Sequence, residues 1–492
     1  MSIYSRSNFL RVFLFGLVLS SLTVSAEARF FQDEKKQTTG EGLFNKVWKP
    51  SEAESRDSGD GLGPMFNGIS CVACHNQGGV GGSGDNIANV QILTVLPRQD
   101  SRRKFRLDQV ALEMLFQQAV KLHPDFQLQN SITLHRSSVQ NAEYNNWLKD
   151  VFEFKSVAKA TGFESNRNLL RERGRLLTET PIHRVKKGSA KDRFTIQISR
   201  RNTPSLFGVG VIDRISDQDI LALESAQKNT DGPVKGIAPI SDDGRIGKFG
   251  WRGEQSSVAK FTSQACAIEL GLSNAEHPQA RIPFPKSHQS SQQCHDISKS
   301  EIKKLVEFVN SLNPIAARLP KTNNESQLLQ KGQDQFKTIG CAACHVQTVG
   351  IAQNVFSDFL LHDMGSELAD ASHSIKIKTQ SVFGRTEQEF EIKNPQRWQT
   401  PPLWGAALSA PYMHDGRSDS FHDAILVHGG EAASSVDKYQ RLAPLDRKLL
   451  LEFLQALGDD SKKEMNKLAP AAHGWGVPPE RSRKGRLVRK QP

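Results

Sequence analysis

The sequence predicts a mainly α-helical protein of two domains in tandem, the first interrupted by a long insert of mixed structure. The first observation is that Cys-x-x-Cys-His occurs twice, at residues 71–75 and 341–345. A Thr-Pro-x-Leu-x-Gly pattern follows each motif, at residues 203–208 and 400–405. Because the same order of motifs returns, the chain contains an internal repeat.

An amphipathic helix pattern closes each half of the repeat. The first begins at Ser298, which stands three residues before Glu301 at capping-box spacing, and the second runs from Leu445 to Leu457. We therefore place the N-terminal domain at 29–320 and the C-terminal domain at 321–460. A linker over Asn313 to Ser326 joins them, because prolines and asparagines interrupt the helical pattern there.

Each Cys-x-x-Cys-His motif has the spacing that attaches c-type haem. The two thiols add to the porphyrin vinyl groups, and the adjoining histidine becomes the proximal iron ligand. A four-cysteine zinc site is the alternative, but its paired hooks usually lie closer in sequence and do not require a histidine. We expect two covalently bound haems in cytochrome c-like domains, held by Cys71, Cys74 and His75 in the first and by Cys341, Cys344 and His345 in the second.

The amino end predicts export. Arg6 and Arg11 precede an apolar run over 12–24, and Ala26-Glu27-Ala28 offers a cleavage site, so residues 1–28 are typical of a signal peptide. A membrane anchor is the alternative, but the run is shorter than the roughly 20 residues that span a bilayer. We expect a periplasmic protein without a membrane span.

The formal net charge of +11 is partly local. Six basic residues crowd the last part of the chain, which has no hydrophobic period, so we expect a basic disordered tail over 461–492 and no nucleic-acid partner. Haem attachment uses four of the six cysteines. The remainder, Cys266 and Cys294, either form a disulfide in the oxidising compartment or stay as two separate buried thiols.

The first domain contains a glycine-rich loop and a long insert. Glycines over 78–84 allow a close approach to a flat ring, or simply a turn. The insert, over about 87–199, has strand-like runs at Val90 to Leu96 and Phe194 to Ile198 and a helical stretch from Leu107 to Leu122. It shows no recognisable chemistry, and we expect a lid or docking surface over the first haem.

Five further stretches carry a family resemblance. They are Gly63-Pro64-Met65-Phe66-Asn67, Phe249-Gly250-Trp251, Thr400 to Gly405, Tyr412-Met413-His414-Asp415-Gly416-Arg417 and His428-Gly429-Gly430-Glu431-Ala432. With them the chain resembles the dihaem c-type oxidoreductase family of peroxidase-like proteins, some of which are labelled thiol oxidoreductases. It is more distantly similar to bacterial dihaem cytochrome c peroxidases, to the dihaem enzyme that matures methylamine dehydrogenase and to dihaem rubber oxygenases.

The resemblance implies a catalytic set at the first haem. Trp251 matches an aromatic residue between the two haems, where it relays electrons, and Gln264 and Glu269 match residues that line the open iron face. A carboxylate there moves a proton between peroxide oxygens. The spacing to Gln264 differs from the peroxidases by several residues. The alternatives are a core indole and a solvated glutamate.

The resemblance also implies metal ligands. His428 stands where the peroxidases place the sixth ligand of the second haem, which is usually methionine. Two imidazole ligands generally lower the reduction potential of the iron relative to a histidine and a methionine. Met413 and Met364 are rival ligands, and His414 suits a supporting or propionate-binding role. Relatives bind calcium between the domains, and Asn202, Ser409 and Pro411 match those positions.

Together these features predict an exported enzyme that reduces peroxide or another small oxidant at the first haem. A small redox protein donates the electrons, which pass through the second haem. The alternatives are an electron carrier with both irons six-coordinate and an oxygenase of an apolar organic substrate. The thiol label has no basis in the residues, since no third Cys-x-x-Cys occurs. His123, His135 and His183 in the insert could still ligate the first iron.

Overall fold

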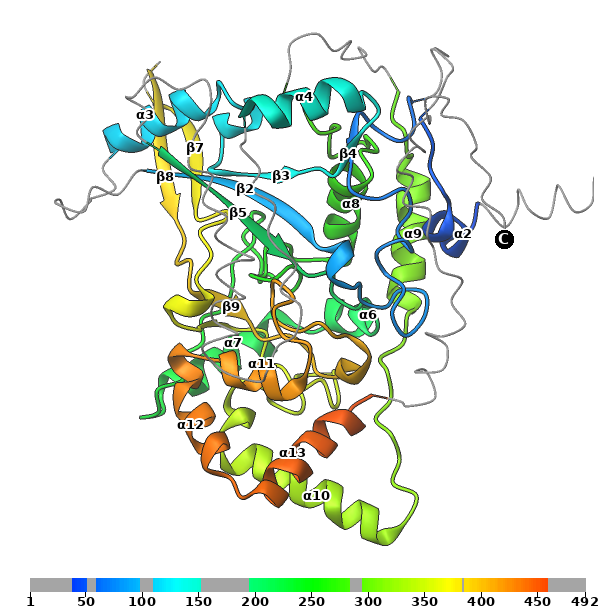
Figure 1. Ribbon diagram of the computed structural model, residues 1–492, viewed down its shortest axis with the longest axis vertical. Coiled ribbons are helices and arrows are strands. Elements are labelled where there is room, and N and C mark those ends of the chain that lie inside the picture. The colour runs from blue at the N-terminus through cyan, green and yellow to red at the C-terminus, as the bar shows by residue number, and fades with distance from the viewer. Residues whose placement is uncertain are drawn as a thin grey trace, which may run out of the picture.

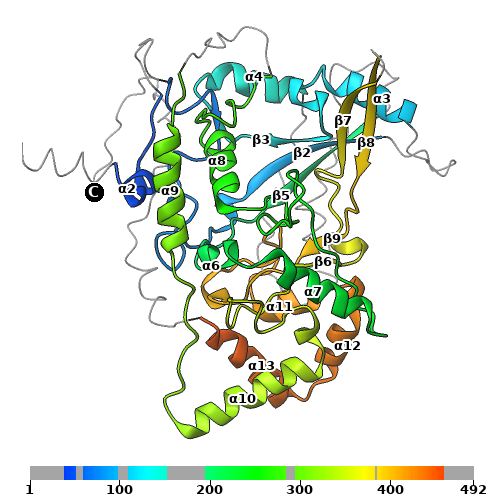
Figure 2. The same ribbon diagram turned by 180° about the vertical axis from the view of Figure 1, so that it is seen from behind.

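The computed structural model describes residues 38–50, 59–97, 109–151, 194–283, 294–382 and 385–458. These residues form short and medium helices with four small sheets, joined by long loops (Figures 1 and 2). The predicted signal peptide, the predicted basic tail and His183 lie outside the described residues. The predicted helical class is confirmed, with more strand structure than the sequence suggested.

The first helical cluster surrounds the first Cys-x-x-Cys-His motif. Its helices are α2 (Gly40–Asn45), α6 (Val209–Asp213), α8 (Val258–Glu269) and α9 (Lys299–Ser311), and α7 (Asp217–Lys228) follows α6. Helix α9 begins as predicted, with the reciprocal capping box between Ser298 and Glu301. The buried core joins these helices to the motif and contains Leu43, Phe44, Val258, Cys266, Leu305 and Val309, with Cys71 and Val72 packed against it.

The second helical cluster surrounds the second motif. It consists of α10 (Asn323–Thr338), α11 (Phe421–Val427), α12 (Ala433–Arg441) and α13 (Pro444–Ala456), and its core includes Phe336, Leu426, Tyr439, Leu450 and Phe453. The predicted end of the linker at Ser326 is wrong, because α10 already starts at Asn323. The Thr322 side chain accepts a hydrogen bond from Glu325 N and so caps the helix.

Helices α10 and α13 make their closest approach at Gly332. A Cβ atom there would lie 2.2 Å from Leu449 O and 2.8 Å from Phe453 Cβ. Alanine favours a helix over glycine by about 1 kcal/mol, but the overpacking costs typically about 1–3 kcal/mol. We expect Gly332→Ala to lower the free energy of unfolding in urea, whereas Lys331→Ala, one position earlier on the same helix and exposed, stays close to wild type. A stabilised Gly332→Ala protein would contradict the close packing.

The insert forms a third core. Strands β2 (Val90–Pro97), β3 (Ser131–Leu134) and β5 (Phe194–Arg201) make an antiparallel sheet in the order β3-β2-β5, and α3 (Gln109–Ala119) and α4 (Asn141–Val151) accompany it. Leu93 pairs with both Ile132 and Ile198 in the sheet, and all three side chains are buried. The two predicted strands and the predicted helix are therefore confirmed within the described residues.

A hairpin from the C-terminal half joins the insert core. Its strands are β7 (Ile375–Val382) and β8 (Arg385–Ile392), and Ile375 is buried among the insert side chains. Asn130 N donates to Ile375 O at 3.2 Å. Figures 1 and 2 show this hairpin and the insert together at one end of the molecule, with α10 and α13 at the opposite end. The insert thus contacts both halves, which a lid over one haem would not require.

Two short antiparallel pairs complete the sheets. Strand β1 (Met65–Phe66) pairs with β4 (Ser137–Ser138), and β6 (Leu361–Asp363) pairs with β9 (Arg397–Gln399). Short 3-10 helices lie at Asn86–Ala88, Pro124–Gln127, Cys341–Ala343, Ser366–Leu368, Ala406–Leu408 and Gly430–Ala432. The β1–β4 pair ties the insert to the segment just before the first motif.

Of the two alternatives for Cys266 and Cys294, the structure has the separate thiols, and the disulfide is not formed. The Cys266 side chain is buried in the first core, where the thiol lies close enough to Cys71 to affect its ionisation. The thiol therefore lies near the first motif. Separately, within the described ranges, the helices are too short or too polar to cross a membrane.

Candidate functional site

The first motif forms a turn directly after β1, and its histidine is held from two sides. His75 Nδ1 lies 3.1 Å from both Gly82 O and Pro204 O. A carbonyl oxygen can only accept, so Nδ1 carries the proton and Nε2 is the ring nitrogen suited to a metal. Burial lowers the pKa of His75 to about 4, which keeps the imidazole neutral.

The glycine loop after this motif is a tight turn. Gly81 has a φ of +91°, and a Cβ atom on Gly82 would lie 1.7 Å from Gln77 O. Only glycine fits this backbone, and the turn places Gly82 O on the His75 ring. The loop therefore orients the histidine.

The second motif is arranged in the same way. His345 Nδ1 donates to Phe356 O at 2.8 Å, and burial lowers the pKa of His345 to about 4. Cys341 lies at the start of a 3-10 helix that follows α10, and Gly340, with a φ of +101°, makes the turn between them. Both motifs thus present a neutral imidazole whose Nδ1 is engaged by the backbone.

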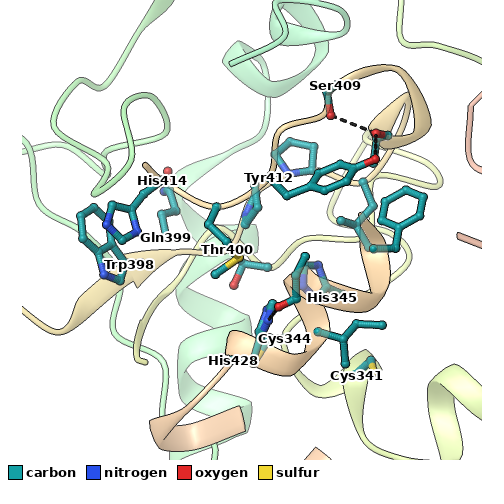
Figure 3. Close-up of a pocket in the computed structure, with 18 of the residues that line it drawn as sticks. Cys341, Cys344, His345, Trp398, Gln399, Thr400, Ser409, Tyr412, His414 and His428 are labelled. Carbon is teal, nitrogen blue, oxygen red and sulfur yellow. Dashed lines mark hydrogen bonds between the residues drawn. The ribbon is translucent and has the colours of Figure 1, made fainter. Parts of the chain in front are cut away.

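A cavity of ≈ 290 Å³ adjoins the second motif (Figure 3). Cys341, Cys344 and His345 line it, and His428 lies on the same cavity at the end of α11. His428 Nδ1 donates to Ala424 O at 2.7 Å, so Nε2 is the ring nitrogen suited to a metal. Met413 and Met364 also line the cavity, so the rival ligands remain near His345.

Glu269, the last residue of α8, lies beside the first motif. Its Oε2 accepts from Asn67 Nδ2 at 2.7 Å, and its charge is close enough to act on Cys74. Burial raises the pKa of Glu269, and the Asn67 hydrogen bond and the Arg136 charge act in the opposite direction. A carboxyl group whose pKa is raised by burial is better able to take up and return a proton, which suits acid–base work.

Gln264 and Trp251 occupy different positions. Gln264 Oε1 accepts from Gln255 Nε2 at 2.9 Å, a contact separate from the Asn67–Glu269 pair. Trp251 lines the cavity of the second motif and donates from Nε1 to Asn202 O at 2.9 Å. Pro204, which touches His75, lines that same cavity, so Trp251 lies in the region between the two motifs.

The three residues predicted to bind calcium meet on the cavity wall. Asn202, Ser409 and Pro411 all line it, and Asn202 Nδ2 donates to Pro411 O at 2.5 Å. Asn202 Oδ1 is buried and has no hydrogen-bond partner among the described residues. An unsatisfied amide oxygen next to a carbonyl oxygen suits a hard cation.

A buried histidine between two carboxylates was missed by the sequence reasoning. His362 Nδ1 lies 2.7 Å from Glu431 Oε2, and its Nε2 lies 2.9 Å from Asp358 Oδ2. The His362 ring lines the cavity, and ligand atoms of His362, Cys344 and Asp358 all lie within 4.8 Å of one another. Glu431 belongs to the His-Gly-Gly-Glu-Ala motif, so this motif was the sequence signal that could have pointed to the site around His362.

A cationic stack lies at another edge of the cavity. The Trp398 and His414 rings stack with centroids 3.7 Å apart, and the Arg252 guanidinium lies 4.2 Å from the Trp398 ring centroid. His414 Nε2 is buried without a hydrogen-bond partner among the described residues. Figure 3 shows this pair projecting from a different side of the cavity than His345 and His428.

Comparison with known proteins gives the class of the molecule. The model of a family described as "Di-haem oxidoreductase, putative peroxidase" matches residues 186–457, which is more than half of the chain. The match defines a dihaem redox protein. More particularly, this chain belongs to the di-haem oxidoreductase family, and haems are its cofactors.

One curated relative is the methylamine utilization protein MauG of Methylorubrum extorquens. It is 32% identical over 124 residues, which are 24% of this chain and 31% of that protein. The chain therefore spans about a third of the length of this relative.

The similar solved structures include the following two, both with low TM-scores. Hydrazine synthase of Kuenenia stuttgartiensis, pressurised with xenon, has a TM-score of 0.30 at 15% identity, covering 52% of this chain and 72% of that chain. A MauG-like protein associated with microbial copper homeostasis has a TM-score of 0.27 at 18% identity, covering 53% and 85%.

Proposed function

We propose that this protein is an exported, periplasmic dihaem c-type oxidoreductase that reduces peroxide at a haem on His75. Electrons from a small redox protein pass through a second haem on His345. The proposal includes tandem haem domains at 29–320 and 321–460. The observation that carries it is an asymmetry: a second imidazole, His428, shares the cavity of His345, whereas a carboxyl group, Glu269, lies beside the first motif.

The residues present fit covalent haem. Each motif offers two thiols and a neutral imidazole whose Nδ1 is fixed by a carbonyl, which is the arrangement that orients an iron ligand. When bound, haem supplies one-electron redox chemistry and peroxide O–O cleavage. His75 and His345 would be the proximal ligands, His428 the sixth ligand of the second haem, and His414 a hydrogen-bond donor to a propionate.

The chain's own residues would supply proton and electron positioning. Glu269 accepts a proton from one peroxide oxygen and returns it to the other, while Asn67 holds its Oε2. Trp251 is fixed by Asn202 O in the region between the motifs, where an indole shortens the electron path. Gln264 would line the open side of the first haem as a hydrogen-bonding residue.

Calcium at the boundary of the two halves is a further part of the proposal. The amide oxygen of Asn202 would turn towards the ion with the backbone oxygens of Pro411 and Ser409. Its orphaned Oδ1 supports this assignment.

The first test is haem attachment. Expressed with a c-type maturation system, the wild-type chain is expected to carry the mass of two haems, and a pyridine haemochrome spectrum is expected to report the same number. Cys344→Ala should leave its haem on a single thioether bond and shift that spectrum. A wild-type mass without covalent haem would overturn the proposal.

The second test separates an enzyme from a carrier. We expect hydrogen peroxide to oxidise a reduced small cytochrome in the presence of the haem-loaded protein. A pure electron carrier would leave the cytochrome reduced, and both its haems would be low-spin. An oxygenase would consume oxygen with an apolar substrate and not with the cytochrome.

A further inference from the structure

The carboxyl end of α8 is held by residues from two distant parts of the chain. Glu269 O accepts from Asn67 N at 2.7 Å, and Leu270 O accepts from Gly63 N at 3.3 Å. His135 Nε2, from the insert, donates to Ile268 O at 2.9 Å. The last carbonyls of a helix have no partner within it, so these bonds fix the end of α8, where Glu269 is located.

The insert also fixes the Asn67 side chain. Arg136 N donates to Asn67 Oδ1 at 3.1 Å, and a backbone N–H can only donate. The amide group must therefore point its Nδ2 towards Glu269, where it donates to Oε2 at 2.7 Å. The pairing of β1 with β4, one residue beyond Arg136, keeps the two segments in this register.

The Arg136 side chain places a positive charge in the same group. It acts electrostatically on Glu269, Cys74 and Asp85, and its Nη2 donates to Asn89 O. His135 adds no charge, because burial lowers its pKa to about 4. Arg136 is thus the charged side chain that acts on Glu269 among the described residues, and Cys74 is uncharged once it is a thioether.

We propose that Arg136 of the insert is a positioning residue of the first haem site. Its backbone N–H orients Asn67 and through it Glu269, and its guanidinium favours anions beside the first motif. This inference rests on the function proposed above. Arg136 and Asn67 lie outside residues 186–457, which the family model matches. The contact between Arg136 and Asn67 therefore belongs to the part of the chain beyond that match.

Fluoride binding to the ferric protein tests the charge. Arg136→Leu keeps the backbone N–H and removes the guanidinium. A nearby positive charge favours a bound anion, so loss of the cation should weaken fluoride binding about tenfold or more. Arg136→Lys should restore most of the affinity. Lys121→Leu, an exposed charge in the same insert, should stay within about twofold of wild type.

The pH dependence of peroxide turnover tests the charge of Arg136 separately, because a purely structural role for this residue would leave that dependence unchanged. Arg136 lowers the pKa of Glu269, so its removal should move the acid limb of peroxide turnover to higher pH. Lys121→Leu should leave the limb in place. Arg136→Gln, a polar neutral variant, gives the same measurements if the leucine variant does not fold.

The two ways of failing are distinct. If the wild type binds fluoride at a high-spin haem and both neutral Arg136 variants match it in affinity and pH profile, the inference is overturned and the peroxidase proposal stands. If the wild type binds no fluoride and both haems are low-spin, the peroxidase proposal falls, and the inference falls with it.

Discussion

Glu269→Gln is expected to slow peroxide turnover by roughly a hundredfold or more, because a positioned proton-transfer group contributes about 10²–10⁴ to a rate. Glutamine keeps the shape of the side chain and its oxygen can still accept from Asn67 Nδ2, but it takes up no proton. Both haem spectra should stay unchanged. The measurement is single-turnover kinetics with hydrogen peroxide.

The pH dependence of the wild type supports the same experiment. The base form of Glu269 is the carboxylate, so turnover should fall as the pH drops through the Glu269 pKa. Burial raises that pKa, which places the acid limb above the usual range of a glutamate. Glu269→Gln should abolish this limb. Gln264→Leu serves as a comparison, and a larger loss with it than with Glu269→Gln would move the proton-transfer role away from Glu269.

His428→Ala is expected to convert the second haem from low-spin to high-spin while the first haem stays as it was. His428 lies on the cavity of His345, and the proton on Nδ1 is held by Ala424 O, so the ring presents Nε2 for coordination. Electron paramagnetic resonance of the oxidised protein should lose the corresponding low-spin signal. Reduction of the first haem by an external donor should slow, because its electron path uses the altered centre.

A matched variant separates His428 from its rivals. Met413→Leu removes the thioether on the same cavity and keeps a side chain of similar volume in the second core. This variant should keep the low-spin signal of the second haem. Loss of that signal in Met413→Leu, with His428→Ala unchanged, would assign the sixth ligand to methionine.

Local patterns predicted the helices and the candidate motifs well. The capping box at Ser298, the strands at Val90 and Phe194 and the closing helix near Leu445 all depend on residues close in sequence, and the structure contains each of them. The linker was drawn too long because asparagines at 323 and 324 look like helix breakers. They are tolerated there because Thr322 caps the helix in front of them.

Contacts between residues far apart in the sequence could not be predicted from local patterns. His135 and Arg136 stood in an insert without recognisable chemistry, and only the pairing of β1 with β4 brings them to Glu269. His362 lies between Asp358, four residues away, and Glu431, sixty-nine residues away, so half of its environment is invisible to any local pattern. The disulfide alternative came from cysteine counting alone, which carries no information on the position of a buried thiol.

The shared core of the insert and the β7–β8 hairpin limits how this protein can be divided. Separating the chain into two fragments between α9 and α10 would leave Ile375 without its insert neighbours. It would also leave Asn130 without the backbone N–H and C=O of residue 375. The two halves are therefore interlocked rather than exchangeable modules. Fragments expressed separately should aggregate, and the same fragments expressed together should assemble into one particle.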